Sequence, residues 1–128
     1  MRQIDMATET VVKILFLCFL ILNFLTEVLA ATALIGGPEG IAAAGRGGLW
    51  SMHYGFAALA IASASLWAWP HRADLRVTTA VLGILLVFHT GLAISLSLAG
   101  DQAAGRAMHV LLAALCLALF TQRRRWCS

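Results

Sequence analysis

The chain has 128 residues, of which 61% are hydrophobic and only 12% are charged, about half the charged fraction of a typical soluble domain. This composition argues against a soluble enzyme, and the length supports one compact unit. The net charge of +3 does not indicate nucleic-acid binding, because the Lys and Arg residues lie at the ends of apolar runs rather than in one patch. The sequence therefore predicts an integral membrane protein whose partner is the lipid bilayer.

The apolar runs predict four transmembrane helices. The first run, residues 14–35, has 22 residues and a single charged group, Glu27, and is long enough to cross a hydrocarbon core of about 30 Å. A loop of small residues with Glu39 and Arg46 follows it, from residue 36 to residue 48. The second helix covers residues 49–69 and ends at Pro70, and a short polar turn joins it to the third helix, residues 77–98.

The last apolar run is the shortest, because residues 107–121 number only 15. A start nearer Ala103, with the Arg106 side chain reaching out of the bilayer, lengthens it, and we expect a helix over about 105–121. Alanine and serine residues throughout the second helix predict close helix packing. The expected fold class is an all-α membrane bundle of four helices, forming one domain over residues 1–128.

The distribution of Lys and Arg predicts the orientation of the bundle. The two termini and the middle turn hold seven of them: Arg2, Lys13, Arg72, Arg76, Arg123, Arg124 and Arg125. The alternate loops hold only Arg46 and Arg106. Since positive residues concentrate on the cytoplasmic side, we expect both termini in the cytoplasm, in a multi-pass protein of the inner (plasma) membrane. A competing interpretation makes the first run a secretory signal cleaved after Val28–Ala30, which leaves the orientation of the rest unchanged.

Ionisable side chains inside the predicted helices are the first candidates for a functional site, because a bilayer penalises them unless they find a partner or water. They are Glu27, His53, His89 and His109. Counting from the outer helix ends at helical rise places Glu27 and His89 about 12 and 13 Å deep, and His53 and His109 about 3 to 6 Å deep. Asn23 lies four residues before Glu27 and shares its helix face, which we expect to point into the bundle.

Three interpretations of these residues remain open. In the first, Glu27 and His89 hydrogen-bond only to fix the packing of the helices. In the second, Glu27 and His89, with Asn23 and Tyr54, form the binding or coupling site of a proton- or cation-coupled transporter of small solutes; neither of these two needs a cofactor. In the third, His53 and His109 bind haem b, or three histidines and Glu27 bind a metal ion.

Residues 27–40 resemble the first helix and loop of the small multidrug resistance transporters. The resemblance implies a four-helix protein that works as a dimer, in which Glu27 exchanges protons for cationic drugs and Tyr54 lines the drug site. The chain departs from that family at Ala30 and Ile35, where the family has glycine and lysine, and its third helix has no tryptophan. The general layout equally resembles that of many small four-helix bacterial membrane proteins.

Enzymatic activity is not expected, because the sequence has no nucleophile paired with a base, no phosphate-binding loop and no extramembrane domain. Proton- or cation-coupled transport predicts a homo-oligomer, since four helices enclose little volume alone. The alternatives are an accessory or structural subunit of a larger membrane complex, and a haem- or metal-binding membrane protein.

Overall fold

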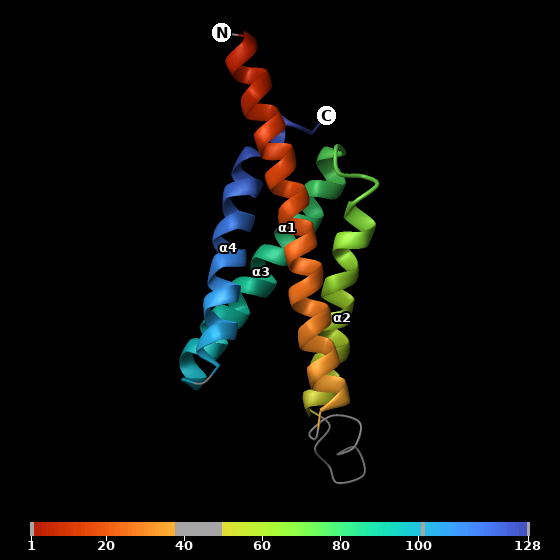
Figure 1. Ribbon diagram of the computed structural model, residues 1–128, viewed down its shortest axis with the longest axis vertical. Helices are drawn as coiled ribbons and strands as arrows, with labels where there is room; N and C mark the ends of the chain where they lie inside the picture. Colours follow the sequence, from red (N-terminus) through yellow and green to blue (C-terminus); the bar gives the residue numbers. More distant parts are fainter. Residues whose placement is uncertain (1, 38–49, 101, 128) are drawn as a thin grey trace. The chain divides into compact units, whose positions relative to one another are not determined.

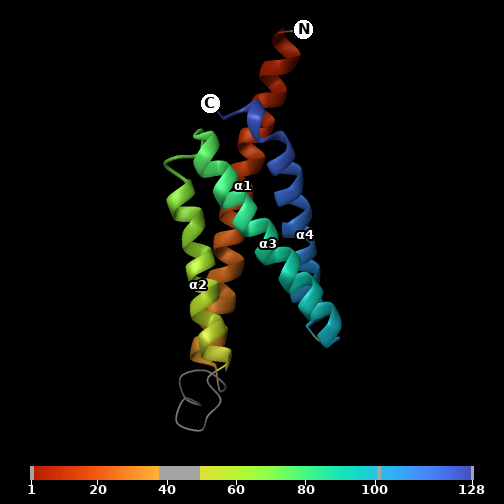
Figure 2. The same cartoon turned by 180° about the vertical axis from the view of Figure 1, so that it is seen from behind.

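The computed structural model describes residues 2–37, 50–100 and 102–127, with side chains from Met6 onward, and these ranges are helical apart from short turns (Figures 1 and 2). The elements in chain order are α1 (Arg2–Gly36), α2 (Trp50–Ala68), α3 (Leu75–Ala99), α4 (Ala103–Gln122) and a 3-10 turn, η2 (Arg123–Arg125). The prediction of an all-α chain with four helices is confirmed. The predicted loop with Glu39 and Arg46, and the predicted start of the second helix at Leu49, lie outside the described residues.

Within the part of the chain that the structure describes, three helices are long and apolar enough to cross a membrane: Met6–Gly36, Leu75–Ala99 and Ala103–Arg125. The last helix is slightly longer than the predicted 105–121, because α4 covers Ala103–Gln122 and has 20 residues. The helix α2 has 19 residues and is not among these three. The chain is therefore a membrane protein by the length and composition of three of its helices.

The helix α1 begins twelve residues before the predicted first residue, Ile14, and has 35 residues in all. Its polar first part is stabilised by an ion pair one turn apart, with Lys13 Nζ 2.6 Å from Glu9 Oε1. Thr10 Oγ1 also donates a hydrogen bond to the Met6 carbonyl, at 3.0 Å. At helical rise α1 is about 52 Å long, so it extends well beyond a hydrocarbon core of about 30 Å.

The chain forms two compact units. The first, the α3–α4 unit, comprises Met1–Phe19 and Ala68–Ser128, and the second, the α1–α2 unit, comprises Leu20–Trp67. The helix α1 contributes its first part to one unit and its second part to the other.

In the α3–α4 unit, α3 and α4 form an antiparallel hairpin, visible in both views (Figures 1 and 2). Asp74 caps α3, because its carboxylate accepts the backbone N–H groups of Val77 and Arg76, which lower the pKa of Asp74 below its ordinary value. Gly100, at φ 74°, ends α3 in the left-handed conformation that favours glycine. The buried faces of the two helices contain Leu82, Leu85, Leu112, Cys116 and Leu119.

In the α1–α2 unit, a stripe of small residues on α2 faces α1. The stripe consists of Gly55, Ala58, Ala62 and Ser65, which recur every three or four residues and are buried. At one end of it, a Cβ placed on Gly55 would lie 3.3 Å from the Ala31 carbonyl oxygen of α1. At the other end, the Asn23 side-chain amide of α1 donates a hydrogen bond to Ser65 Oγ at 2.8 Å. Small residues thus bring the two backbones close together, as is common between membrane helices.

Candidate functional site

The α3–α4 hairpin brings two histidines together. His89 of α3 and His109 of α4 lie with their Nδ1 atoms 3.0 Å apart, in a buried hydrogen bond. Their ring centroids are 5.3 Å apart and their planes are inclined by only 28°, so the two rings meet nearly edge to edge through their Nδ1 atoms. The Phe88 ring meets both imidazoles edge to face, at centroid distances of 5.2 and 6.2 Å. An aromatic side chain thus fixes the orientation of the histidine pair.

The short distance between two like nitrogens restricts the protonation of this pair. A neutral imidazole has one N–H donor and one acceptor nitrogen, so one Nδ1 must donate and the other must accept. If both Nδ1 atoms carried hydrogen, the two N–H groups would point at each other. The pair therefore shares one proton across its hydrogen bond, and any exchange of protons with other groups takes place at the Nε2 atoms.

The prediction that His109 lies nearer the outer surface than His89 is wrong, since the two rings are in contact. The prediction counted depth from Ala107, whereas α4 begins four residues earlier, at Ala103. Four residues correspond to about 6 Å of helix, and this accounts for most of the predicted difference in depth. The position at which α4 begins therefore decides whether His109 can reach His89.

The polar face of α1 meets α2 within the α1–α2 unit. Asn23 donates to Ser65, a partner that the sequence analysis did not identify. Tyr54 of α2 lies within electrostatic range of the Glu27 carboxyl group. Ser51 does not join this polar group, because its hydroxyl donates to the Leu34 carbonyl, at 3.4 Å. A carboxyl group, a phenol and an amide–hydroxyl pair are thus present between α1 and α2.

Two predicted pairings join residues of different units and remain predictions. Glu27 belongs to the α1–α2 unit and His89 to the α3–α4 unit. His53, proposed with His109 as a haem ligand, is exposed on α2. The pairing that the structure does bring together, His89 with His109, was not predicted.

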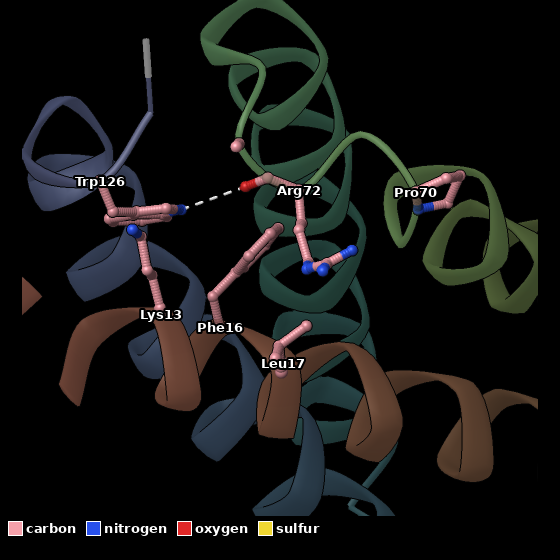
Figure 3. A pocket seen from close by; sticks show the side chains of 7 residues that line it. Lys13, Phe16, Leu17, Pro70, Arg72 and Trp126 are labelled. Carbon is pink, nitrogen blue, oxygen red and sulfur yellow. Dashed lines mark hydrogen bonds between the residues drawn. The ribbon is translucent and has the colours of Figure 1, made fainter. Parts of the chain in front are cut away.

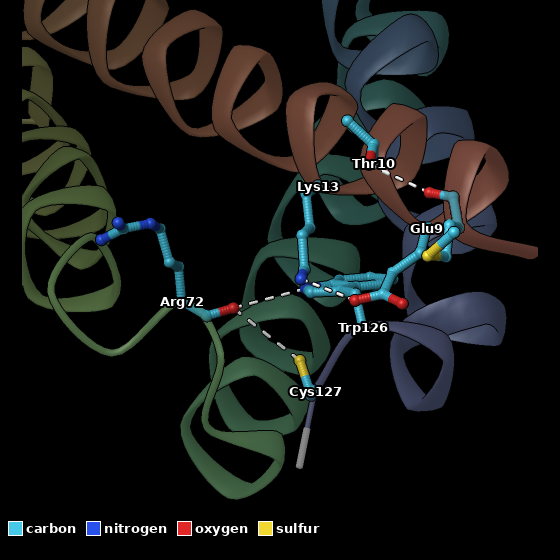
Figure 4. A network of polar contacts seen from close by, with 7 residues as sticks. Glu9, Thr10, Lys13, Arg72, Trp126 and Cys127 are labelled. Atoms are coloured by element: carbon cyan, nitrogen blue, oxygen red, sulfur yellow. Dashed lines mark hydrogen bonds and ion pairs between the residues drawn. The ribbon is translucent and has the colours of Figure 1, made fainter.

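A second group of side chains gathers where α1, the turn after α2 and the C-terminal segment meet in the α3–α4 unit (Figures 3 and 4). Trp126 Nε1 donates to the Arg72 carbonyl at 3.3 Å, and its ring lies 5.6 Å from that of Phe16. The Cys127 thiol contacts the same carbonyl, at 3.8 Å. From the sequence, Lys13 and Arg72 predict only the orientation in the membrane, and no site is expected here. The available sequence signal for such a site was a basic residue close to an aromatic one, as Lys13 is to Phe16 and Arg72 is to Trp69.

Comparisons with protein-family models, with curated proteins and with solved structures give no match for this chain. The function is therefore argued from the site alone.

Proposed function

We propose that this chain is a proton-exchanging membrane transporter, in which proton movement through the His89–His109 pair is coupled to the passage of a small solute or cation. The observation that carries the proposal is the 3.0 Å hydrogen bond between the two Nδ1 atoms, inside a hairpin of two helices that can each cross a membrane. Ionisable groups at such positions are rare, and they commonly mark proton or ion pathways.

The hydrogen-bonded pair can pass a proton from one ring to the other. A proton arriving at Nε2 of the first ring makes that ring an imidazolium, whose Nδ1 proton crosses the hydrogen bond to the second ring. The second ring then releases the proton from its own Nε2. One proton has entered and one has left, and the pair is neutral again with its donor and acceptor roles exchanged. Glu27, with Tyr54 nearby, is the proposed carboxylate through which this exchange is coupled to the solute.

A metal-binding protein is the second candidate. Two imidazoles of a tetrahedral zinc site, at bond lengths of about 2.0–2.1 Å, place their ligating nitrogens roughly 3.3 Å apart. The His89 and His109 Nδ1 atoms, 3.0 Å apart, need only a small separation to act as such ligands. Zinc would then displace the shared proton, so the two candidates make opposite predictions for proton exchange when zinc is added.

We further propose that α2 is the fourth span, with both termini in the cytoplasm. Three segments far apart in sequence support this assignment, because Phe16, Arg72 and Trp126 meet at one end of the α3–α4 unit. The helix α1 leads away from this end after Phe16, and α2 must return to it before Pro70. The contacts of α2 along the length of α1, from Ser51 with Leu34 to Ser65 with Asn23, agree with such a return.

A reporter fused after Ser128 tests the topology. With four spans, we expect a reporter that is active only in the cytoplasm to be active there, and inactive in the loop between α3 and α4. If α2 does not cross, only three helices span and the two ends of the chain lie on opposite sides. An inactive C-terminal fusion together with a cytoplasmic N-terminus would therefore disprove the fourth span.

Proton flux in reconstituted vesicles tests the proposed activity. Vesicles containing the purified protein and a trapped pH-sensitive dye should change their internal pH when a membrane potential is applied, faster than protein-free vesicles. Zinc added at micromolar concentration should leave this flux unchanged if the histidines only exchange protons, and should block it if they bind the metal. Flux no faster than that of protein-free vesicles, with and without candidate cations, would contradict the proposal.

A further inference from the structure

A cavity of about 390 Å³ lies at the end of the α3–α4 unit where the first part of α1 meets the C-terminal segment (Figure 3). It is formed by three segments that are distant in sequence: residues 13–17 of α1, residues 70–73 of the turn, and Trp126. Its volume is within the range of small-molecule binding sites. The proton-exchange proposal makes no use of it.

The cavity has an apolar, aromatic side. The Phe16 and Trp126 rings lie 5.6 Å apart and are 1% and 6% exposed, so each is held firmly in place. The indole N–H of Trp126 is bonded to the Arg72 carbonyl, which fixes the ring orientation. Leu17 and Pro70 complete this surface. Tryptophan with its N–H bonded and its ring against apolar groups is typical of the boundary between lipid headgroups and acyl chains.

The same cavity has a positively charged side. Lys13 Nζ is paired with Glu9 Oε1, as Figure 4 shows, and one Arg72 guanidinium nitrogen donates to the Trp69 carbonyl at 3.0 Å. A lysine ammonium has three donors and a guanidinium has five, so each of these side chains has donors beyond the bond named here. Both can therefore hold an additional anionic oxygen.

Charges around the cavity reinforce this preference for anions. Cations at this end of the unit outnumber anions by four among the side chains that the structure describes. The cations are Lys13, Arg72, Arg76, Arg123, Arg124 and Arg125, and the anions are Glu9 and Asp74. Such an excess attracts anionic lipid to the membrane surface in addition to any direct contact.

We propose that this cavity binds an anionic phospholipid, with its phosphate held by the Lys13 and Arg72 side chains and its glycerol region against Phe16 and Trp126. A lipid fits better than a soluble phosphate, because the aromatic side would be left without a partner by a purely polar ligand. By joining α1, the turn and the C-terminal segment, the lipid would stabilise one end of the unit. This binding site does not rest on the proposed proton exchange.

Native mass spectrometry of the protein in detergent micelles doped with lipid tests the proposal. The protein should retain phosphatidylglycerol and lose phosphatidylcholine. The double variant Lys13→Gln/Arg72→Gln should bind phosphatidylglycerol about tenfold to thirtyfold more weakly, since each basic residue contributes roughly fivefold. The bond from Trp126 is kept in this variant, because its acceptor is the backbone of residue 72.

The matched control is Arg76→Gln/Arg124→Gln, which removes the same charge at the same end, from residues that line a separate depression beside α3. It should weaken phosphatidylglycerol binding several-fold less than the Lys13/Arg72 double variant does, because Arg76 and Arg124 act only through the general positive charge and not by direct contact with the phosphate. The charge-conserving variant Lys13→Arg/Arg72→Lys should retain the lipid, and it separates loss of charge from loss of folding. Equal losses in both double variants, equal retention of the two lipids, or displacement of the lipid by millimolar glycerol phosphate would each overturn the proposal.

Discussion

Replacing His109 with glutamine should lower the proton flux of reconstituted vesicles by about tenfold or more. A glutamine amide keeps one donor and one acceptor with which to bond His89, but it does not take up and release a proton at neutral pH. His89→Gln should cause the same loss. Because the two rings act as one exchanging unit, the double variant should lose no more than either single variant. Flux is measured with the trapped dye under a fixed membrane potential.

The control for this prediction is Cys116→Ser, on the same face of α4. The Cys116 thiol donates a buried hydrogen bond to the Leu82 carbonyl at 3.0 Å, and a serine hydroxyl can donate in its place. This variant alters a buried polar contact of the hairpin without removing an imidazole, so its flux should equal that of the unmodified protein. Wild-type flux in both histidine variants would show that the pair exchanges no protons.

Glu27→Gln examines the carboxylate separately. If Glu27 couples proton movement to a solute, the variant should fold and reach the membrane normally but lose the proton-dependent transport. If the carboxyl group only helps α1 and α2 to pack, stability in detergent should fall while the flux per folded molecule is unchanged. A coupling role therefore predicts a loss of transport, and a packing role predicts a loss of stability.

The four helices could be predicted from sequence because apolar length is a strong signal in membrane proteins, and the helix limits could not. The first part of α1 has no apolar run, and its helix is stabilised by local contacts such as that of Lys13 with Glu9. The start of α4 contains Gly105 and Arg106, which weaken the apolar signal without interrupting the helix. Backbone hydrogen bonds extend a helix past the residues that an apolar count includes.

Parts of the candidate site could be predicted from spacing, and others depend on contacts between helices. The four-residue interval placed Asn23 and Glu27 on one face, and the structure gives each of them a neighbour on α2. Ser65 could not be selected as the partner, because other serines and alanines of α2 offer the same composition. The histidine pair could not be predicted, because placing His109 at the depth of His89 requires the first residue of α4 to be known to within one helical turn.

The cavity beside Trp126 could not be predicted from the sequence for a different reason. Its residues come from positions 13–17, 70–73 and 126, and no local pattern relates segments so far apart. Lys13 and Arg72 also carry a second signal, because positive residues mark the cytoplasmic ends of membrane helices whether or not they bind a ligand. The contacts of Trp126 with the Arg72 carbonyl and with the Phe16 ring bring these segments into one group.

Replacing Gly55 with leucine should destabilise the α1–α2 unit by about 1–3 kcal/mol, through overpacking of a close helix contact. A Cβ on residue 55 would lie 2.6 Å from Ile35 Cγ1 and 3.2 Å from Leu34 Cβ. The Ile35 side chain can rotate away, but the Ala31 carbonyl, at 3.3 Å, is backbone and can move only with α1. The leucine should therefore push α2 off α1 and lengthen the Asn23–Ser65 bond. The thermal midpoint of the protein in detergent measures the effect.

Gly91 on α3 provides the matched control, because a Cβ placed there would meet no atom within 4 Å. Both glycines lie inside helices, so leucine improves the intrinsic helix preference equally at the two positions, by roughly 1 kcal/mol or less. The difference between the two variants isolates the packing term. A series of alanine and leucine at residue 55 should lower the midpoint in steps as the side chain grows, whereas the same series at residue 91 should leave it unchanged or slightly raised. Equal midpoints for the two leucine variants would mean that α1 and α2 do not approach as closely at Gly55 as the small-residue stripe requires.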